Sequence, residues 1–164
     1  MNLKRRTWSQ IALFSLLIAA DQISKWWVEQ QPPFWQQIVI PGFFSLVKAH
    51  NFGVAFSMLA DWGHEWRTGL LLGLTLGIAL ALLAWWWKER RRKGWTSWLL
   101  TLVLAGAIGN IWDRTQLGYV VDFIDVYINL AGDEYHWPAF NIADSCITIG
   151  VIGLILVQWR GRHR

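Results

Sequence analysis

The chain has 164 residues, a length that suits a single domain. Its residues are 54% hydrophobic and only 16% charged, whereas soluble domains have roughly 25% charged residues, so we expect long membrane-spanning segments. The formal net charge of +4 is too unevenly distributed to indicate a nucleic-acid partner, and a single cysteine without any metal-binding or nucleotide-binding motif gives no reason to expect a disulfide, a metal or another cofactor.

The first apolar segment follows a basic start and continues to Val28. A basic segment before an apolar run is typical of a signal peptide, but the sequence up to Ala20 is a poor cleavage site and the run continues past it. We therefore predict an uncleaved transmembrane helix over about residues 8–28, with Asp21 and Lys25 toward its outer end.

A β-rich segment is predicted next, over about residues 35–60. Two prolines at 32–33 end the helix, and residues 38–40 and 43–47 are rich in β-branched and aromatic side chains. Pro-Gly at 41–42 separates these two short predicted strands. We expect a small extramembrane element here.

Three further apolar segments complete the pattern, at about 68–87, 94–112 and 142–159. A run of 20 residues at about 1.5 Å per residue covers roughly 30 Å, the thickness of a bilayer's hydrocarbon core. A basic segment, 88–93, separates the apolar segments 68–87 and 94–112. A polar and aromatic outer loop, 113–139, precedes the apolar segment 142–159. The sequence predicts one integral domain that is mainly α, with four transmembrane helices and the β-rich element on the outer side.

The basic residues predict the orientation. Of the 15 lysines and arginines, 11 fall on the side of the termini: Lys4, Arg5, Arg6, Lys88, Arg90, Arg91, Arg92, Lys93, Arg160, Arg162 and Arg164. Because cytoplasmic loops carry an excess of lysine and arginine, both termini are predicted to be cytoplasmic. Many of the 14 tryptophans lie near span ends, as expected for side chains that prefer the membrane interface.

Two carboxylates in apolar surroundings, Asp122 and Asp144, then fall on the outer side. Acidic residues at the edge of a span are costly and usually functional. Two carboxyl groups that lie close together hold one proton between them, which suits acid–base hydrolysis of a peptide bond. Their separation in sequence does not establish contact. The alternative for Asp122 is a solvated acidic residue in a loop. The alternative for Asp144 is an acidic residue at a helix N-terminus, where the helix dipole favours a negative charge.

Five sequence blocks carry a family resemblance: DQISK at 21–25, NFGVAF at 51–56, GAIGNIWDR at 106–114, VVDF at 120–123 and FNIAD at 140–144. The order of these blocks, the length of the chain and its four-span layout resemble those of the bacterial lipoprotein signal peptidases, also called signal peptidase II or prolipoprotein signal peptidase. The resemblance covers nearly the whole chain. Each block alone is a weak signal, but five in order form a strong one.

The resemblance implies a metal-free aspartyl endopeptidase of the bacterial inner membrane, in contact with membrane lipids. It implies that the enzyme removes the signal peptide from diacylglyceryl-modified prolipoproteins, just before the lipidated cysteine, on the periplasmic side. The two catalytic aspartates of the family correspond to Asp122 and Asp144. The resemblance also implies inhibition by globomycin, which occupies the same site.

Eight further residues are expected to bind the substrate or orient the aspartates: Asp21, Lys25, Asn51, Gly53, Asn110, Asp113, Arg114 and Asn141. Asp21 and Lys25 share a helix face and can pair, either in the site or as a structural ion pair. Asn51 can donate hydrogen bonds to a substrate or serve as a turn residue. Arg114 can pair with an aspartate and hold it ionised.

A small proton-coupled transporter is the alternative, with Asp21, Asp122 and Asp144 as a proton relay. A transporter is expected to show internal repeats and charges near the bilayer midplane, whereas these charges lie near the outer edge. A non-catalytic membrane scaffold gives no reason for paired aspartates.

Overall fold

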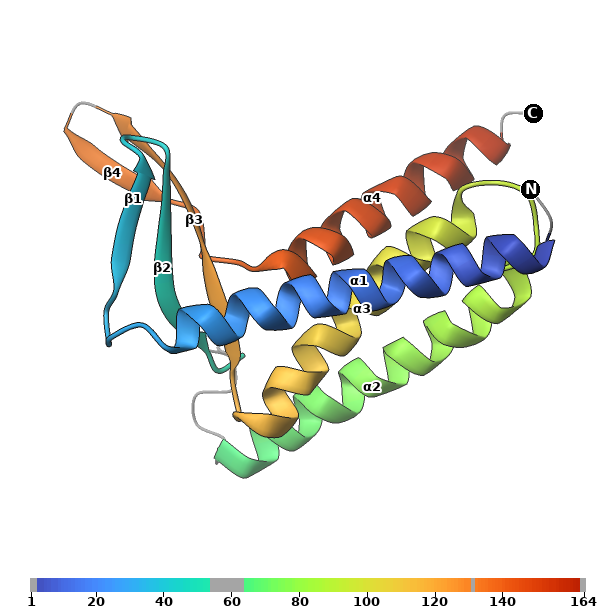
Figure 1. Ribbon diagram of the computed structural model, residues 1–164, viewed down its shortest axis with the longest axis horizontal. Helices are drawn as coiled ribbons and strands as arrows, with labels where there is room; N and C mark the ends of the chain where they lie inside the picture. Colours follow the sequence, from blue (N-terminus) through green and yellow to red (C-terminus); the bar gives the residue numbers. More distant parts are fainter. Residues whose placement is uncertain (1–2, 54–63, 131, 163–164) are drawn as a thin grey trace.

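The computed structural model describes residues 3–53, 64–130 and 132–162. Within them, the elements in chain order are α1 (Leu3–Glu29), β1 (Gln36–Ile40), β2 (Phe44–Asn51), α2 (His64–Glu89), α3 (Thr96–Gln116), β3 (Val120–Leu130), β4 (Asp133–His136) and α4 (Ile142–Arg162). Figure 1 shows an elongated helical bundle with the strands at one end and both termini at the other. The prediction of a mainly helical chain with a small β-rich element is confirmed.

Helix α3 is the centre of the bundle, because it packs against α1, α2 and α4. Its two glycines allow the closest approaches. A Cβ atom on Gly106 would lie 2.2 Å from the Ala143 carbonyl oxygen, and one on Gly109 would lie 2.6 Å from Asp21 Oδ2. Small residues at such positions let helix backbones approach closely in lipid. The first turn of α4 and the polar face of α1 therefore meet on α3.

The sheet is antiparallel throughout, in the order β1-β2-β3-β4. The β1–β2 hairpin agrees with the predicted strands, and the turn between them contains Gly42, whose φ of +76° is in the region that favours glycine. Residues 54–60 of the predicted β-rich segment lie outside the described residues. In the register of β2 and β3, Asn51 faces Val120 and Ala49 faces Asp122.

The outer segment 113–139, which we expected to be a loop, differs from that expectation. Helix α3 continues to Gln116, and residues 120–130 and 133–136 form two of the four strands. Most of the first half of β3 is buried, because β2 flanks it and the bundle covers its inner end. A strand with little apolar–polar alternation gives a weak sequence signal, which is why it was missed.

The outer part of the sheet has a buried polar contact of its own. Asp125 on β3, 4% exposed, accepts a hydrogen bond from Ser45 Oγ at 2.7 Å. His136 Nδ1 lies 2.9 Å from Asp125 Oδ1, and its ring stacks on Tyr127. The hydrogen bond to Asp125 raises the pKa of His136, and this contact connects β4 to β3.

Two of the described helices are long and apolar enough to cross a membrane, over Lys4–Glu29 and Ile142–Gly161. They correspond to the predicted spans 8–28 and 142–159. The spans 68–87 and 94–112 coincide with most of α2 and α3, whose membrane crossing stays a prediction.

Candidate functional site

The first turn of α4 holds Asp144 in reciprocal hydrogen bonds with Asn141, the residue that precedes the helix. The Asp144 backbone N–H donates to Asn141 Oδ1 at 2.9 Å, and the Asn141 backbone N–H donates to Asp144 Oδ2 at 3.3 Å. This is a capping-box arrangement, in which two side chains satisfy N–H groups that have no partner within the helix. The same residues that start the helix therefore fix the direction of the Asp144 carboxylate.

Asp122 lies on β3 and is only 3% exposed. Its Oδ1 accepts a hydrogen bond from Asn141 Nδ2 at 2.7 Å, and its Oδ2 accepts one from Asn51 Nδ2 at 2.9 Å. Asn51 is the last residue of β2, and the pairing of β2 with β3 brings it beside Asp122. Both partners are neutral amides, so they orient the carboxyl group without neutralising its charge.

Asn141 therefore contacts both aspartates, Asp122 through its side-chain amide and Asp144 through its backbone N–H. Strand β3 and helix α4 each contribute one carboxyl group to the same location. The Arg114 guanidinium interacts electrostatically with both. Two carboxyl groups and a cation around one asparagine form a site that can bind a water molecule and transfer protons.

The electrostatic surroundings favour a proton on Asp122. Burial is the main reason why its pKa is raised to about 6, and the negative charge of Asp144 adds to the rise. The hydrogen bonds from Asn51 and Asn141, and the charge of Lys25, act in the opposite direction. A carboxyl group with this pKa can be protonated or ionised near neutral pH, as acid–base catalysis requires.

Asn110 connects this site to the centre of the bundle. Its Nδ2 donates to Asp144 Oδ1 at 2.7 Å, and its Oδ1 accepts a hydrogen bond from Lys25 Nζ at 3.0 Å. An ammonium group can only donate, so Lys25 determines which end of the Asn110 amide faces Asp144. Lys25 thus orients the Asp144 carboxylate through Asn110, without touching it.

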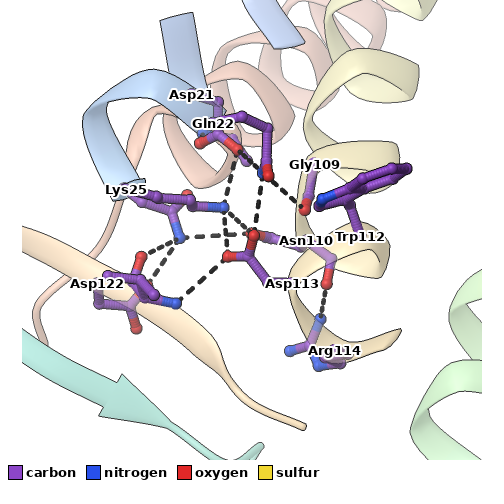
Figure 2. A network of polar contacts seen from close by, with 12 residues as sticks. Asp21, Gln22, Lys25, Gly109, Asn110, Trp112, Asp113, Arg114 and Asp122 are labelled. Carbon is purple, nitrogen blue, oxygen red and sulfur yellow. Dashed lines mark hydrogen bonds and ion pairs between the residues drawn. The ribbon is translucent and has the colours of Figure 1, made fainter. Parts of the chain in front are cut away.

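Figure 2 shows the polar network around Lys25. The predicted pairing of Asp21 with Lys25 is confirmed, with Nζ 2.8 Å from Asp21 Oδ2, and Asp113 Oδ2 lies 2.9 Å from the same nitrogen. With Asn110, the lysine has three acceptors for its three N–H groups. Asp21 Oδ1 also accepts the Ala143 backbone N–H at 2.9 Å, which holds the start of α4 against α1.

Gln22 belongs to this network and was not among the predicted residues. Its Nε2 donates to Asp113 Oδ1 at 2.9 Å, and it lies 3.1 Å from Asp21 Oδ2 and 3.3 Å from the Gly109 carbonyl oxygen. The available signal was its position beside Asp21 within an apolar run, where a polar side chain requires a partner.

Gly53 and Arg114 are the predicted residues that remain to be placed. Gly53, at a φ of +78°, ends β2 in a turn whose backbone N–H donates to Asn51 Oδ1 at 2.9 Å, so Asn51 is both a turn residue and a partner of Asp122. Residues 54–56 of the matched block lie outside the described residues.

Arg114 differs from the expectation of a direct ion pair. Among the described residues it has no carboxylate oxygen within 4 Å, because its guanidinium bonds back to the Asn110 carbonyl oxygen at 3.5 Å.

A metal centre has no candidate ligands in the part of the chain that the structure describes, since no three His, Cys, Asp or Glu side chains there are grouped to hold an ion. Cys146 is buried on α4, and its thiol is not part of the hydrogen-bonded site. The polar groups around Asp122 and Asp144 are amides and the guanidinium of Arg114.

Comparisons with known proteins find one family. The family model described as signal peptidase (SPase) II matches residues 13–160. The chain is 39% identical over 158 residues to the lipoprotein signal peptidase of Solibacter usitatus (strain Ellin6076), covering 96% of this chain and 94% of the relative. It is 40% identical over 162 residues to the lipoprotein signal peptidase of Pseudomonas syringae pv. tomato, covering 98% and 90%.

Two solved structures are also similar, both described as bacterial membrane enzymes whose structures were obtained by the in meso method. One superposes with a TM-score of 0.79 at 31% identity, covering 93% of this chain and 88% of that one. The other has a TM-score of 0.78 at 33% identity and covers 92% of each chain. The similarity extends over the sheet and the bundle together.

Proposed function

Because the chain belongs to the signal peptidase II family, we propose that it removes the signal peptide from prolipoproteins as an aspartyl endopeptidase, with Asp122 and Asp144 as the catalytic pair. The observation that carries the proposal is the convergence of both carboxyl groups on Asn141. A bacterial membrane location follows from the family and from the similar membrane enzymes.

In the proposed reaction, Asp122 is protonated and Asp144 is ionised at the start. Asp144 removes a proton from a water molecule as the water oxygen attacks the scissile carbonyl carbon. Asp122 donates a hydrogen bond to the carbonyl oxygen, where negative charge develops. When the C–N bond breaks, the proton on Asp144 passes to the leaving amine, so the pair returns to one shared proton.

The raised pKa of Asp122 supports this assignment of the proton. Asn110 and the Asn141 backbone both donate to Asp144 and hold its carboxyl group in position. Arg114, close to both aspartates, is placed to stabilise negative charge as it develops on the substrate.

The finer features of the proposal come from the family resemblance. They are cleavage just before a diacylglyceryl-modified cysteine, inhibition by globomycin, four spans in the inner membrane with both termini cytoplasmic, and a site on the periplasmic side. The position of the aspartates at the sheet end of the bundle, away from the basic end with the termini, supports this orientation.

A proton relay through Asp21, Asp122 and Asp144, as in a transporter, has less support. Asp21 is 2% exposed and its oxygens are occupied by Lys25 and the Ala143 N–H. These contacts join Asp21 to the packing of α1 against α4, which accounts for this buried acid without a relay.

The test uses purified protein and a diacylglyceryl-modified prolipoprotein peptide, with the products weighed by mass spectrometry. Asp122→Asn and Asp144→Asn should each lower kcat by about 10³-fold or more, because each removes a group that transfers a proton in the reaction. Asp133→Asn, an exposed acid on β4, is the matched control and should cleave at the wild-type rate. Near-wild-type cleavage by either active-site variant would refute the pair, and a product that does not begin at the lipidated cysteine would refute the cleavage position.

A further inference from the structure

A cavity lies at the end of the bundle opposite the sheet, far from the aspartates. It has a volume of about 520 Å³, and its walls come from the N-terminal part of α1, the C-terminal end of α2 and the middle of α3. Figure 1 shows these helix ends beside the termini. The volume is within the usual range for small-molecule sites, about 300–1,000 Å³.

The interior of this cavity is apolar, with Ile11 and Phe14 on α1, Leu83 on α2 and Leu104 on α3. Trp86 closes one side, where its indole N–H donates to Thr101 Oγ1 at 3.0 Å. An apolar cavity that opens between helices in a membrane protein suits hydrocarbon chains.

Three basic residues surround the cavity toward the helix ends: Lys4, Arg90 and Arg91. The acidic residue in the same loop, Glu89, is paired with Arg92 at 2.8 Å and does not line the cavity. Arg90 lies over the Trp87 ring, 3.4 Å from its centroid, which holds one cation beside the membrane interface. The cavity therefore combines an apolar interior with a cationic entrance.

A buried polar atom beside the cavity has no hydrogen-bond partner among the described residues. Gln10 is fully buried and lines the cavity, and its Oε1 has no hydrogen bond within the described part of the chain, while its Nε2 donates to Ser97 Oγ at 2.8 Å. Turning the amide over would let the Ser97 hydroxyl donate to Oε1 and would free Nε2 instead. Either way one buried amide atom remains unpaired, which is costly unless an occupant of the cavity bonds to it.

We propose that this cavity binds an anionic glycerophospholipid of the leaflet on the side of the termini. The phosphate lies among Lys4, Arg90 and Arg91, and an acyl chain enters the apolar interior. Gln10 is six residues from Lys4 on α1, about 9 Å deeper along the helix, and with its amide turned over its N–H can donate to a carbonyl oxygen of the bound lipid. Basic pockets between helices on the cytoplasmic side of membranes bind lipid headgroups in this way.

Charge complementarity favours this occupant over a signal peptide. The n-region of a signal peptide is positively charged, so it would be repelled by the three basic residues at the entrance. The proposal does not depend on the peptidase chemistry, because no residue of this cavity contacts the aspartates.

The test titrates the full-length protein in neutral detergent with phosphatidylglycerol or with phosphatidylethanolamine of the same acyl chains, and measures dissociation constants by native mass spectrometry. We expect phosphatidylglycerol to bind at least about tenfold more tightly. Arg90→Ala/Arg91→Ala should weaken its binding roughly 30-fold, which corresponds to about 1 kcal/mol for each basic residue. The control Arg5→Ala/Lys93→Ala removes two charges from the same end outside the cavity, and should change binding by less than about threefold.

Three results would overturn the proposal: equal affinity for the two lipids, equal weakening by the control variant, or displacement of the lipid by a signal peptide with a basic n-region. If Arg90→Ala/Arg91→Ala does not fold, Ile11→Trp fills the cavity with its charges intact. It should weaken binding of phosphatidylglycerol at least about tenfold, whereas Leu16→Trp, on an exposed part of α1 outside the cavity, should not. Equal binding by both tryptophan variants would also overturn it.

Discussion

Two buried acidic clusters adjoin each other at the sheet end of the bundle, and they differ in what faces their carboxylates. Asp21 and Asp113 share the Lys25 ammonium group, whose three N–H groups are all matched. Among the described residues, Asp122 and Asp144 have only neutral donors within hydrogen-bond distance, and Asn110 and Asn141 supply most of them. In the first cluster one cation is shared by two carboxylates in fixed contacts, which suits a structural role, whereas the second keeps a carboxyl group whose proton is easily exchanged.

The comparison also suggests a division of labour. Lys25 supports Asp144 through Asn110, and Asp21 holds the start of α4 through the Ala143 N–H. The cluster around Lys25 thus helps to fix the geometry of the Asp122–Asp144 cluster. Variants that separate stability from activity provide the tests.

Removing the shared cation should have the largest effect on stability. Lys25→Met leaves two buried carboxylates without a counter-charge, and should lower the free energy of unfolding in mixed micelles by about 3–5 kcal/mol. Adding Asp21→Asn and Asp113→Asn removes those charges and should recover much of the loss. If Lys25→Met is as stable as the wild type, the cluster does not have the structural role described.

A smaller loss is expected where α3 approaches Asp21. Gly109→Ala would place a Cβ atom 2.6 Å from Asp21 Oδ2, a side chain that the Lys25 and Ala143 contacts prevent from moving freely. We expect a cost of about 1–3 kcal/mol, measured by the same unfolding assay. Gly77→Ala on α2 is the control, because its added Cβ meets nothing within 4 Å, and it should be neutral or slightly stabilising. Equal effects of the two substitutions would argue against the close approach.

In the Asp122–Asp144 cluster we expect the opposite behaviour. Replacing the Asp122 carboxyl group should raise the free energy of unfolding. The pKa of Asp122 is about 6 in the folded protein, whereas its ordinary value, which applies to the unfolded chain, is 3.8. Ionisation of Asp122 therefore lowers the free energy of unfolding progressively as pH rises from about 4 to above 6. Asp122→Asn does not titrate, and should be about 1–2 kcal/mol more stable than the wild type at pH 8. The difference should vanish at pH 4. A gain of the same size at both pH values would contradict the raised pKa.

The smallest effect is expected at the outer part of the sheet. The pKa of His136 is raised by Asp125, so its stabilising contact is complete below the ordinary value of 6.5 and is lost as pH rises through the folded pKa. Amide hydrogen exchange in β4 should therefore be faster at pH 9 than at pH 6, after correction for intrinsic rates. His136→Ala should remove this difference, and its persistence in the variant would assign it to another group.

The helices and several contacts were predictable because local sequence determines them. The spacing of Asp21 and Lys25 places them on one helix face, and the ion pair is present. Asn141 and Asp144 are close enough in sequence to form the capping arrangement. The catalytic role of Asp122 and Asp144 stays a prediction until the variants are measured.

Contacts between distant segments were not predictable. Asn51 reaches Asp122 across 71 residues because β2 pairs with β3, and the sequence gives no register for strands so far apart. Gln22 was missed because its partners come from α3. The indirect electrostatic role of Arg114, in place of an ion pair, depends on where its helix ends.

The direction of the Asn141 and Asn110 amides has a consequence for inhibitor design. Both present N–H groups to the carboxyl groups, so a ligand arriving there meets acceptor oxygens and, on the proposed mechanism, one acidic proton on Asp122. A single alcohol oxygen satisfies both requirements, because it can donate to the ionised Asp144 carboxylate while it accepts from the protonated carboxyl group of Asp122. Compounds with a tetrahedral carbinol in place of the scissile amide should therefore bind more tightly than the corresponding ketones, which cannot donate.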